Sequence, residues 1–346
     1  MEANSKTLVP GETQRVSWVR LLVIGSVLAA LPAIFQSTGF ADYLTYIVVR
    51  MMILGLYAMS YDLLLGYSGI FSYGHATFLG CGAYAVAILM VRTNLHIQDA
   101  IPGLVAALAV GVLIGWVMGF LCARVGQVAV FLVSFAFTES IQLLVMSDPL
   151  RITNAEDGIS GIPRETFLGF LNIKPEVNFY YFVLILLGLS YLALLIIIRK
   201  PIGDVFTAIR ENPVRVRFLG YRIRHYRIAA FMISGFFASL AGALTALHEK
   251  AVAPEMLNWF LSGDAVLFVV LGGPGTLIGP VLGAAIVVIF QEILSDIFKN
   301  WVVFLGISYI ALIMFLPKGL FPLFDRIHSR RPPPRENTES VEARKG

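Results

Sequence analysis

The sequence predicts an all-α polytopic transmembrane helical bundle of about ten crossings, with broken or re-entrant helices. Three observations predict this class. The chain is 58% hydrophobic and only 14% charged, which is far outside the usual composition of soluble domains. Several uncharged runs, such as residues 100–123 and 178–198, are long enough to cross about 30 Å of hydrocarbon as helices. These runs are apolar on every face, whereas the strands of a membrane β-barrel alternate.

Nine apolar segments are expected to enter the membrane, and one of them is too long for a single ordinary span. That long segment, residues 259–290, is interrupted by glycine and proline, so it is expected to form two crossings or a re-entrant hairpin. The nine segments are residues 21–36, 42–65, 75–91, 100–123, 128–147, 178–198, 228–248, 259–290 and 300–316.

The basic residues predict the orientation, because Lys and Arg are retained on the cytoplasmic side. The loop 199–227 is rich in Arg and is expected in the cytoplasm, whereas the more acidic segment 148–177 is expected outside. Residues 1–20 are read as a cytoplasmic tail, 21–320 as the transmembrane domain, and 321–346 as a basic, disordered cytoplasmic tail. Both termini inside require an even number of crossings, which agrees with splitting residues 259–290.

Two segments that interrupt apolar runs are candidates for a transport pathway. They are "GYSGIFSYGH" (66–75) and "LGGPGTLIGP" (271–280). Irregular backbone at membrane depth survives where protein buries it or where it lines a water-filled passage, and paired breaks in two halves of a chain are typical of transporters. Close helix packing is the alternative explanation, and it is preferred for the repeated glycines of "GVLIGWVMG" (111–119). The candidate pathway residues in the two breaks are Ser68, Gly69, Ser72, Gly74, His75, Gly272, Gly273 and Gly275.

Three ionisable groups at membrane depth, Glu139, Asp264 and His75, are further candidates. Such groups are costly unless they have a partner or water, so a structural or pathway-lining hydrogen bond is expected for each. Arg50 lies inside the second span and is expected to reach the interface or to face the bundle interior. The two cysteines lie in apolar runs with no pattern of metal ligands around them, so no metal and no cofactor is predicted.

The cytoplasmic loop is expected to contain a short amphipathic helix from Phe206 to Leu219, ended by Gly220. Such a helix either lies on lipid headgroups or docks in a groove of another protein.

Three motifs resemble those of one protein family and occur along the chain in the same order as in that family. "AIRENPVRVRFLGYRIRHYRIAAFMISGFFASLAGAL" (208–244) is similar to the cytoplasmic coupling loop and following span of the M-type permease subunits of ATP-binding-cassette importers for branched-chain amino acids. "LLLGYSGIFSYGHATFLGCGAYAVAIL" (63–89) and "VVLGGPGTLIGPVLGAAIVV" (269–288) resemble its early and late glycine signatures. The resemblance extends from about residue 45 to about residue 320, and Glu139 falls in "AFTES", which is similar to a further element of the family.

The resemblance implies a multi-pass protein of the bacterial inner membrane that forms a translocation pathway and does not hydrolyse ATP itself. Its implied partners are a homologous H-type permease, two cytoplasmic ATPase subunits and a periplasmic solute-binding protein, besides membrane lipid; no nucleic acid is implied. The coupling contacts with the ATPase would be Ala208, Arg210, Glu211, Asn212 and Gly220. The chain contains no G-x-x-x-x-G-K-[ST] phosphate loop, which agrees with separate ATPases.

Three alternatives are kept. Permeases for urea and short amides have related sequences. An ion-gradient-driven secondary transporter would use Glu139 and the broken helices as a self-contained site. A membrane-embedded enzyme is disfavoured because the sequence shows no cluster of His, Cys or Asp with catalytic or metal-ligand spacing.

Overall fold

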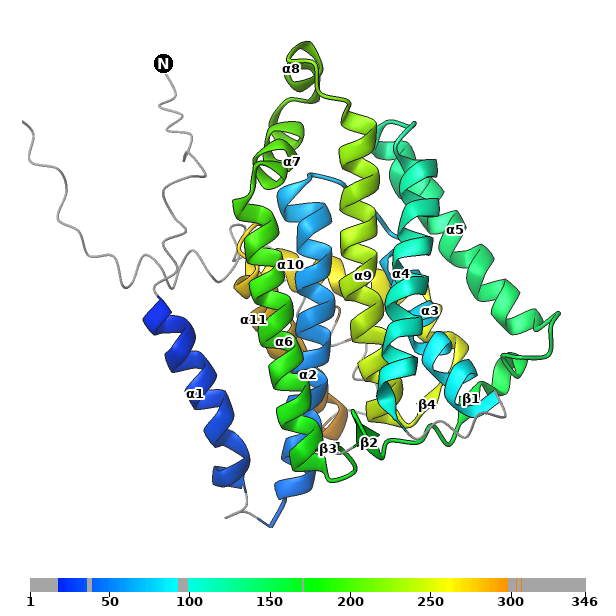
Figure 1. Ribbon diagram of the computed structural model, residues 1–346, viewed down its shortest axis with the longest axis vertical. Helices are drawn as coiled ribbons and strands as arrows, with labels where there is room; N and C mark the ends of the chain where they lie inside the picture. The colour runs from blue at the N-terminus through cyan, green and yellow to red at the C-terminus, as the bar shows by residue number, and fades with distance from the viewer. Residues whose placement is uncertain are drawn as a thin grey trace, which may run out of the picture.

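The computed structural model describes residues 18–35, 39–92, 99–169, 171–297, 303 and 306. These residues form a bundle of α-helices (Figure 1). The helices are α1 (Trp18–Phe35), α2 (Ala41–Asp62), α3 (His75–Ala87), α4 (Ala100–Cys122), α5 (Gln127–Ser147), α6 (Glu176–Arg199), α7 (Pro201–Glu211), α8 (Pro213–Phe218), α9 (Ile223–Glu249), α10 (Trp259–Gly272) and α11 (Ile278–Ile297). Short π-helical turns extend α2 to Tyr67 and α3 to Arg92.

The structure confirms the predicted class. Within the described residues, seven helical segments are long and apolar enough to cross a membrane. The predicted spans from 42–65 to 228–248 each coincide with a helix to within a few residues. Residues 259–290 are indeed two helices, α10 and α11. The predicted span 300–316 lies outside the described residues apart from positions 303 and 306, as do the C-terminal tail and nearly all of the N-terminal tail.

The two ends of the bundle differ: short β-strands lie at one end, and the short helices α7 and α8 lie at the other. At one end, called the strand end, β1 (Ile159–Ser160) pairs with β4 (Ala251–Val252), and β2 (Thr166–Phe167) pairs with β3 (Leu171–Asn172); both pairs are antiparallel. At the other end, called the α7 end, α7 and α8 project from the bundle (Figure 1).

The segment that joins α5 to α6 is folded by its own charged side chains. The Asp148 carboxylate accepts backbone hydrogen bonds from Ile152, Thr153 and Asn154. Desolvation alone would raise the pKa of Asp148, but these hydrogen bonds, led by that of Thr153, lower the pKa to about 2. Further along, Arg164 forms an ion pair with Glu176 in the first turn of α6. The connection at the strand end is therefore held at both of its ends.

Small residues bring α3 and α4 close to α9. Gly111, Gly115 and Gly119 each lie against α9 so closely that an added Cβ would crowd its atoms, and Gly242 of α9 does the same against the backbone of Leu79. This confirms helix packing as the role of the repeated glycines in 111–119, because a face without side chains lets two helix backbones approach closely.

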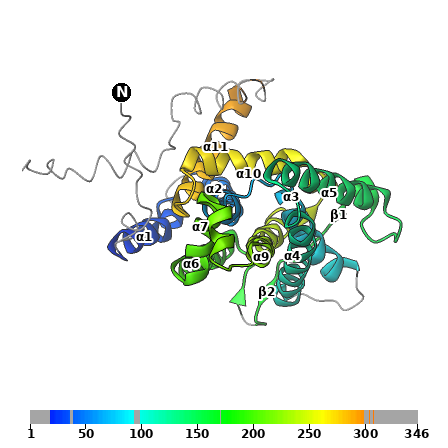
Figure 2. The same ribbon diagram turned by 90° about the horizontal axis from the view of Figure 1, so that it is seen from above.

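The α10–α11 pair forms a hairpin rather than two full crossings. α10 has 14 residues, or about 21 Å at 1.5 Å per residue, which is shorter than the hydrocarbon core. It lies across the neighbouring helices in both views (Figures 1 and 2). After a turn at residues 273–277, α11 returns along α2, with Val281 packed against Gly55 and Glu292 accepting a hydrogen bond from Tyr43. The hairpin therefore turns toward the α7 end and leads back to the strand end.

We predict that Gly242→Ala destabilises the bundle, because its new methyl group would overlap the Leu79 carbonyl in a contact between two helix backbones. Overpacking of this kind costs about 1–3 kcal/mol, so the thermal unfolding midpoint of the full chain in detergent should fall. Gly188→Ala is the matched control, because nothing lies within 4 Å of a Cβ at Gly188 of α6. Equal midpoints for the two variants would contradict the packing account.

Candidate functional site

The two broken segments, some two hundred residues apart in the sequence, meet at the carboxylate of Asp62. The backbone N–H of Gly275 donates to Asp62 Oδ1 at 2.7 Å, and that of Leu277 donates to Oδ2 at 3.0 Å. Asp62 is fully buried at the end of α2, one turn before Gly66. We call this contact region the junction: Asp62, the segment 66–74 and the turn 273–277.

Glycine is required in the junction for both conformation and space. Gly69, Gly273 and Gly275 have φ values of +65°, +106° and +80°, a region that side chains other than glycine rarely adopt. A Cβ on Gly66 would collide with Asp62 and with the backbone of Gly275. The glycines that interrupt the two apolar runs therefore allow the two breaks to fit against each other.

Helix α7 touches the junction directly through Arg210. Nη1 of Arg210 donates a hydrogen bond to the carbonyl oxygen of Gly66, and the aliphatic part of the Arg210 side chain packs against Gly69. On its other side, the carbonyl oxygen of Gly69 accepts a hydrogen bond from Gln127 at the start of α5, at 3.0 Å. A displacement of α7 would therefore be felt at the first break without any intervening element.

The predicted single helix 206–219 is two helices, and this corrects the expectation. Asn212 is extended, with φ −155° and ψ 94°, as expected for a residue that precedes proline. Its side chain accepts a hydrogen bond from the Arg215 N–H at 3.0 Å and so caps α8. Gly220 does end the segment, with φ +86°. The sequence "ENP" (211–213) already indicated the boundary between the two helices, because the residue before a proline disfavours the helical conformation.

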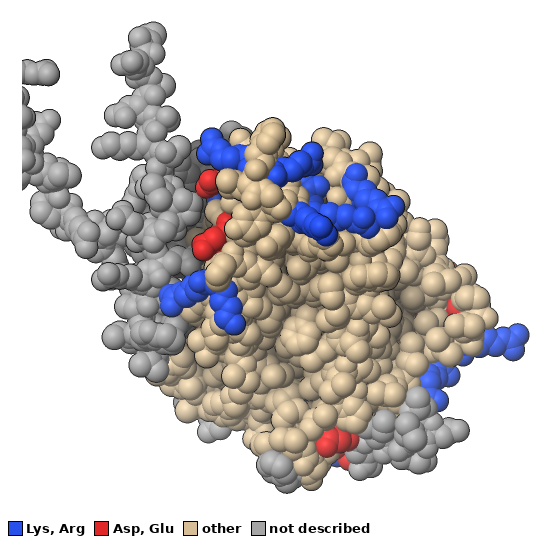
Figure 3. Space-filling model, turned by 45° about the horizontal axis from the view of Figure 1, so that its top comes forward, with Lys and Arg blue, Asp and Glu red and all other residues tan. Residues whose placement is uncertain are grey.

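The apolar residues of α7 and α8 do not share one face. Phe206 and Ile209 are buried against the bundle, whereas Phe218 is 87% and Leu219 is 70% exposed. Glu211 is also exposed, and Ala208 is partly buried. The α7 end therefore presents an apolar tip surrounded by charged side chains, and basic side chains gather around it (Figure 3).

The remaining candidates of the first break are packed inside the bundle. His75 Nε2 lies 2.8 Å from Ser60 Oγ, and its ring is surrounded by Tyr57, Tyr61 and Phe78. The other three are buried: the carbonyl of Ser72 accepts from Tyr61, Gly74 packs against α4, and Ser68 Oγ has no hydrogen-bond partner among the described residues. These contacts favour a structural role for His75.

Glu139 lies apart from the junction, on α5. One of its carboxylate oxygens, Oε1, is buried and has no hydrogen-bond partner within the described residues. Its neighbour Thr138 instead forms a hydrogen bond with Thr77 of α3 at 2.7 Å. Oε1 of Glu139 thus makes no hydrogen bond to the broken segments among the described residues, although α5 itself reaches the first break through Ser134 Oγ, which accepts a hydrogen bond from the Tyr73 N–H at 2.9 Å.

Asp264 and Arg50 line one cavity of about 480 Å³, between α2, the end of α9, α10 and α11. His248, Glu249 and Gln291 add polar groups, and Ile53, Leu54, Met256, Leu261 and Phe268 add apolar walls. Ala251 of β4 and its neighbour Ala253 line it at the strand end. Arg50 thus faces the bundle interior, one of the two positions expected for it, and has carboxylates of opposite charge beside it.

Sequence reasoning missed Asp62 as a functional residue. The available signal was a carboxylate inside an apolar span, four residues before Gly66 of the first break. Its partners are backbone N–H groups more than two hundred residues away, and no sequence pattern indicates that pairing.

Most of the sequence also matches a known protein family. Residues 43–316, which include the junction, α7 and the cavity, match the family described as branched-chain amino acid transport system / permease component. The chain belongs to this family. It is therefore a transporter component, a permease with apolar helices that place it in the inner membrane.

Curated relatives of the permease include amino-acid and sugar permeases. The high-affinity branched-chain amino acid transport system permease protein LivM of Escherichia coli K12 is 30% identical over 334 residues, covering 90% of this chain and 75% of the relative; LivM of Salmonella typhimurium LT2 gives the same figures. The ribose import permease protein RbsC of Escherichia coli K12 is 27% identical over 213 residues, covering 59% of this chain and 63% of the relative. No solved structure matches the permease.

We predict that Asp62→Asn destabilises the permease. An amide offers one acceptor oxygen instead of two and turns an N–H donor toward the backbone donors of the turn 273–277. Loss of a hydrogen bond to a charged group costs about 1.5–3 kcal/mol, so the unfolding midpoint in detergent should fall. Asp42→Asn, exposed in the first turn of the same helix, is the matched control. A midpoint for Asp62→Asn as high as that of the control would show that the carboxylate does not hold the junction.

Proposed function

We propose that this permease forms the translocation pathway of an ATP-driven importer for branched-chain or related amino acids. The proposed partners are a homologous H-type permease, two cytoplasmic ATPase subunits and a periplasmic solute-binding protein. The α7 end and both termini would face the cytoplasm, and the strand end would face the periplasm. The observation that carries the proposal is the cavity of Arg50 and Asp264, which α10 connects to the junction and so to α7.

The chemistry of the cavity supports a zwitterionic substrate with an apolar side chain. A guanidinium such as that of Arg50 pairs with a carboxylate, and the carboxylates of Asp264 and Glu249 can accept hydrogen bonds from an ammonium group. The apolar walls from α2 and α10 leave room for an aliphatic side chain, and the volume of about 480 Å³ is in the usual range for small-molecule sites. Ala251 and Ala253, which line the cavity, lie at the strand end. In the proposed orientation the cavity is therefore closer to the periplasm.

The path from α7 to the cavity supports coupling to an ATPase. Arg210 donates a hydrogen bond to the Gly66 carbonyl, and Asp62 accepts one from Gly275 in the turn that follows α10. Asp264 of the cavity is a residue of α10. An ATPase that binds α7 and α8 differently in its two nucleotide states could shift α10 relative to α2, because a ligand moves an equilibrium only through differential contacts. The result would be alternating access to the cavity.

Two alternatives fit less well. Ribose, urea and short amides carry no charge, so they cannot pair with both Arg50 and the cavity carboxylates as the two charged groups of a zwitterion can. A secondary transporter with Glu139 in its site has less support, because the buried Oε1 of Glu139 forms no hydrogen bond with either break within the described residues.

The substrate prediction is tested by uptake of labelled leucine, isoleucine, valine, other amino acids, ribose, urea and short amides, in cells with and without the gene. The proton gradient is collapsed while ATP is maintained. Gene-dependent uptake of branched-chain amino acids should persist, and Arg50→Gln should lower it about tenfold, since a charged hydrogen bond contributes about 1.5–3 kcal/mol.

Arg92→Gln is the matched control for Arg50→Gln, because Arg92 is exposed at the end of α3 and does not line the cavity. Loss of uptake with the gradient would show an ion-driven mechanism instead. Uptake of ribose or urea alone would overturn the amino-acid proposal.

The coupling prediction concerns Arg210 and Glu211. Arg210→Ala removes the contact with Gly66, and Glu211→Ala removes an exposed charge at the end of α7. Each should lower ATP-dependent uptake by about tenfold or more, while the amount of permease in the membrane stays unchanged. Asp204→Ala, exposed in the first turn of the same helix, should retain uptake. Normal uptake and normal recovery of the ATPase with the Arg210 and Glu211 variants would contradict coupling through α7.

A further inference from the structure

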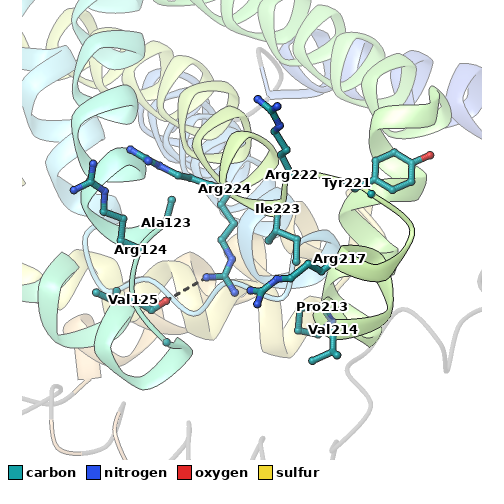
Figure 4. Close-up of a pocket in the computed structure, with 13 residues that line it drawn as sticks. Ala123, Arg124, Val125, Pro213, Val214, Arg217, Tyr221, Arg222, Ile223 and Arg224 are labelled. Atoms are coloured by element: carbon teal, nitrogen blue, oxygen red, sulfur yellow. Dashed lines mark hydrogen bonds between the residues drawn. The ribbon is translucent and has the colours of Figure 1, made fainter.

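A second cavity, of about 690 Å³, opens at the α7 end (Figure 4). It lies between the turn that joins α4 to α5, helix α8 and the first turns of α9. The residues that line it are Ala123, Arg124, Val125, Gly126, Pro213, Val214, Arg217, Gly220, Tyr221, Arg222, Ile223, Arg224 and Arg227. Neither the proposed substrate pathway nor the junction includes these residues.

The charge of this cavity is of one sign. Five of its lining side chains are arginines, and none of the described lining residues is Asp or Glu. Like charges that converge repel one another unless an anion lies between them, and the repulsion grows where protein displaces water. The cavity therefore has the electrostatics of an anion site.

Two long helices begin at the wall of the cavity. α5, of 21 residues, starts after Gly126, and α9, of 27 residues, starts after Arg222; neither residue forms a side-chain capping hydrogen bond. The first N–H groups of a helix have no partner within the helix, and the helix dipole favours negative charge at this end. The backbone thus adds to the attraction for an anion that the arginines create.

Three of the five guanidinium groups are held in place, and one of these three has an unused donor. Arg227 donates from Nη1 to the carbonyl oxygen of Val125 at 3.2 Å, while its Nε is buried with no hydrogen-bond partner in the described part of the chain. Arg124 and Arg224 both lie over the ring of Phe120, at 4.4 and 4.7 Å from its centroid. Figure 4 shows Arg217 extending from α8 toward Val125.

We propose that this cavity binds a phosphate group. The planar fork of donors on arginine matches phosphate oxygens, and several arginines together with helix N-termini form a typical phosphate site. The cavity lies at the C-terminal end of α4 and the N-terminal ends of α5 and α9, three helices long and apolar enough to cross a membrane, so in this proposal it lies at the level of the membrane surface. Leu121 and Val128 are 42% and 80% exposed in the adjoining helix turns, so an anionic phospholipid could place its headgroup among the arginines and its acyl chains on these residues. Soluble phosphate is the other source of the same group.

A bound phosphate would connect α8 and the start of α9 to the α4–α5 turn. It would thereby fix the projecting segment that ends at Gly220 relative to the bundle. The site does not depend on the proposed substrate, but it shares α8 and Gly220 with the proposed ATPase contact.

The test uses the full chain, purified in a neutral detergent. Native mass spectrometry measures bound phosphatidylglycerol, and thermal unfolding is followed with phosphatidylglycerol, with phosphatidylcholine or with inorganic phosphate. The variant is Arg217→Gln with Arg222→Gln, both exposed in the structure, so that folding is not compromised. The matched control is Arg215→Gln with Lys200→Gln, which removes the same charge from exposed residues at the α7 end that do not line the cavity.

We expect phosphatidylglycerol to bind and to raise the unfolding midpoint of the wild type and of the control variant, and phosphatidylcholine not to do so. Affinity should fall about tenfold or more in the Arg217 and Arg222 variant, since each charged hydrogen bond contributes about 1.5–3 kcal/mol. The same pattern with inorganic phosphate, without lipid, would identify soluble phosphate as the source. Equal affinity of the two variants for both probes, or no binding of either probe to the wild type, would overturn the proposal.

Discussion

The burial of the Asp62 carboxylate is the constraint on which the arrangement of this permease depends. A buried charge without partners costs several kcal/mol, and here two backbone N–H groups of the turn after α10 supply the hydrogen bonds. The guanidinium of Arg210 adds a favourable charge nearby. The contact between the two breaks and the position of the turn after α10 depend on this group, and α7 reaches the same region through Arg210 and Gly66.

Glycine makes this arrangement possible because the two breaks offer backbone groups to the side chains of Asp62 and Arg210. A hydrogen-bonded backbone at the junction can change its partners with small rotations, whereas the packed faces of α3, α4 and α9 leave little freedom. Close contacts between small residues hold α3, α4 and α9 together, and they also hold α10 against α11 through Gly272 and Gly283, so what distinguishes the junction is its hydrogen-bonded irregular backbone. Movement during transport is most easily accommodated at the junction.

Much of the fold could be predicted from the sequence, because hydropathy and length fix where helices cross and glycine marks where they break. The split of 259–290 followed from its length, from its interruption by glycine and proline, and from the even number of crossings that the termini require. The inclination of α10 could not be predicted, since it depends on what the turn 273–277 contacts. Arg210 was expected to face a partner protein, but its side chain also reaches inward to Gly66; the sequence shows a charge at a helix end and not its direction. Asn212 and Pro213 could have been read as a helix boundary, and Asp62 as a buried group in need of donors, but its donors could not be named.

The pairing of Asp62 with Gly275 also has a consequence for biosynthesis. The two residues are 213 positions apart, and ribosomes add about 5–20 residues per second, so Gly275 is made roughly 10–40 s after Asp62. Throughout that interval the second helix carries a carboxylate whose permanent partners do not yet exist. The second helix therefore enters the bilayer before its carboxylate has these hydrogen-bond donors. Until the α10–α11 hairpin is inserted, either the insertion machinery shields the carboxylate from lipid or the carboxyl group is protonated.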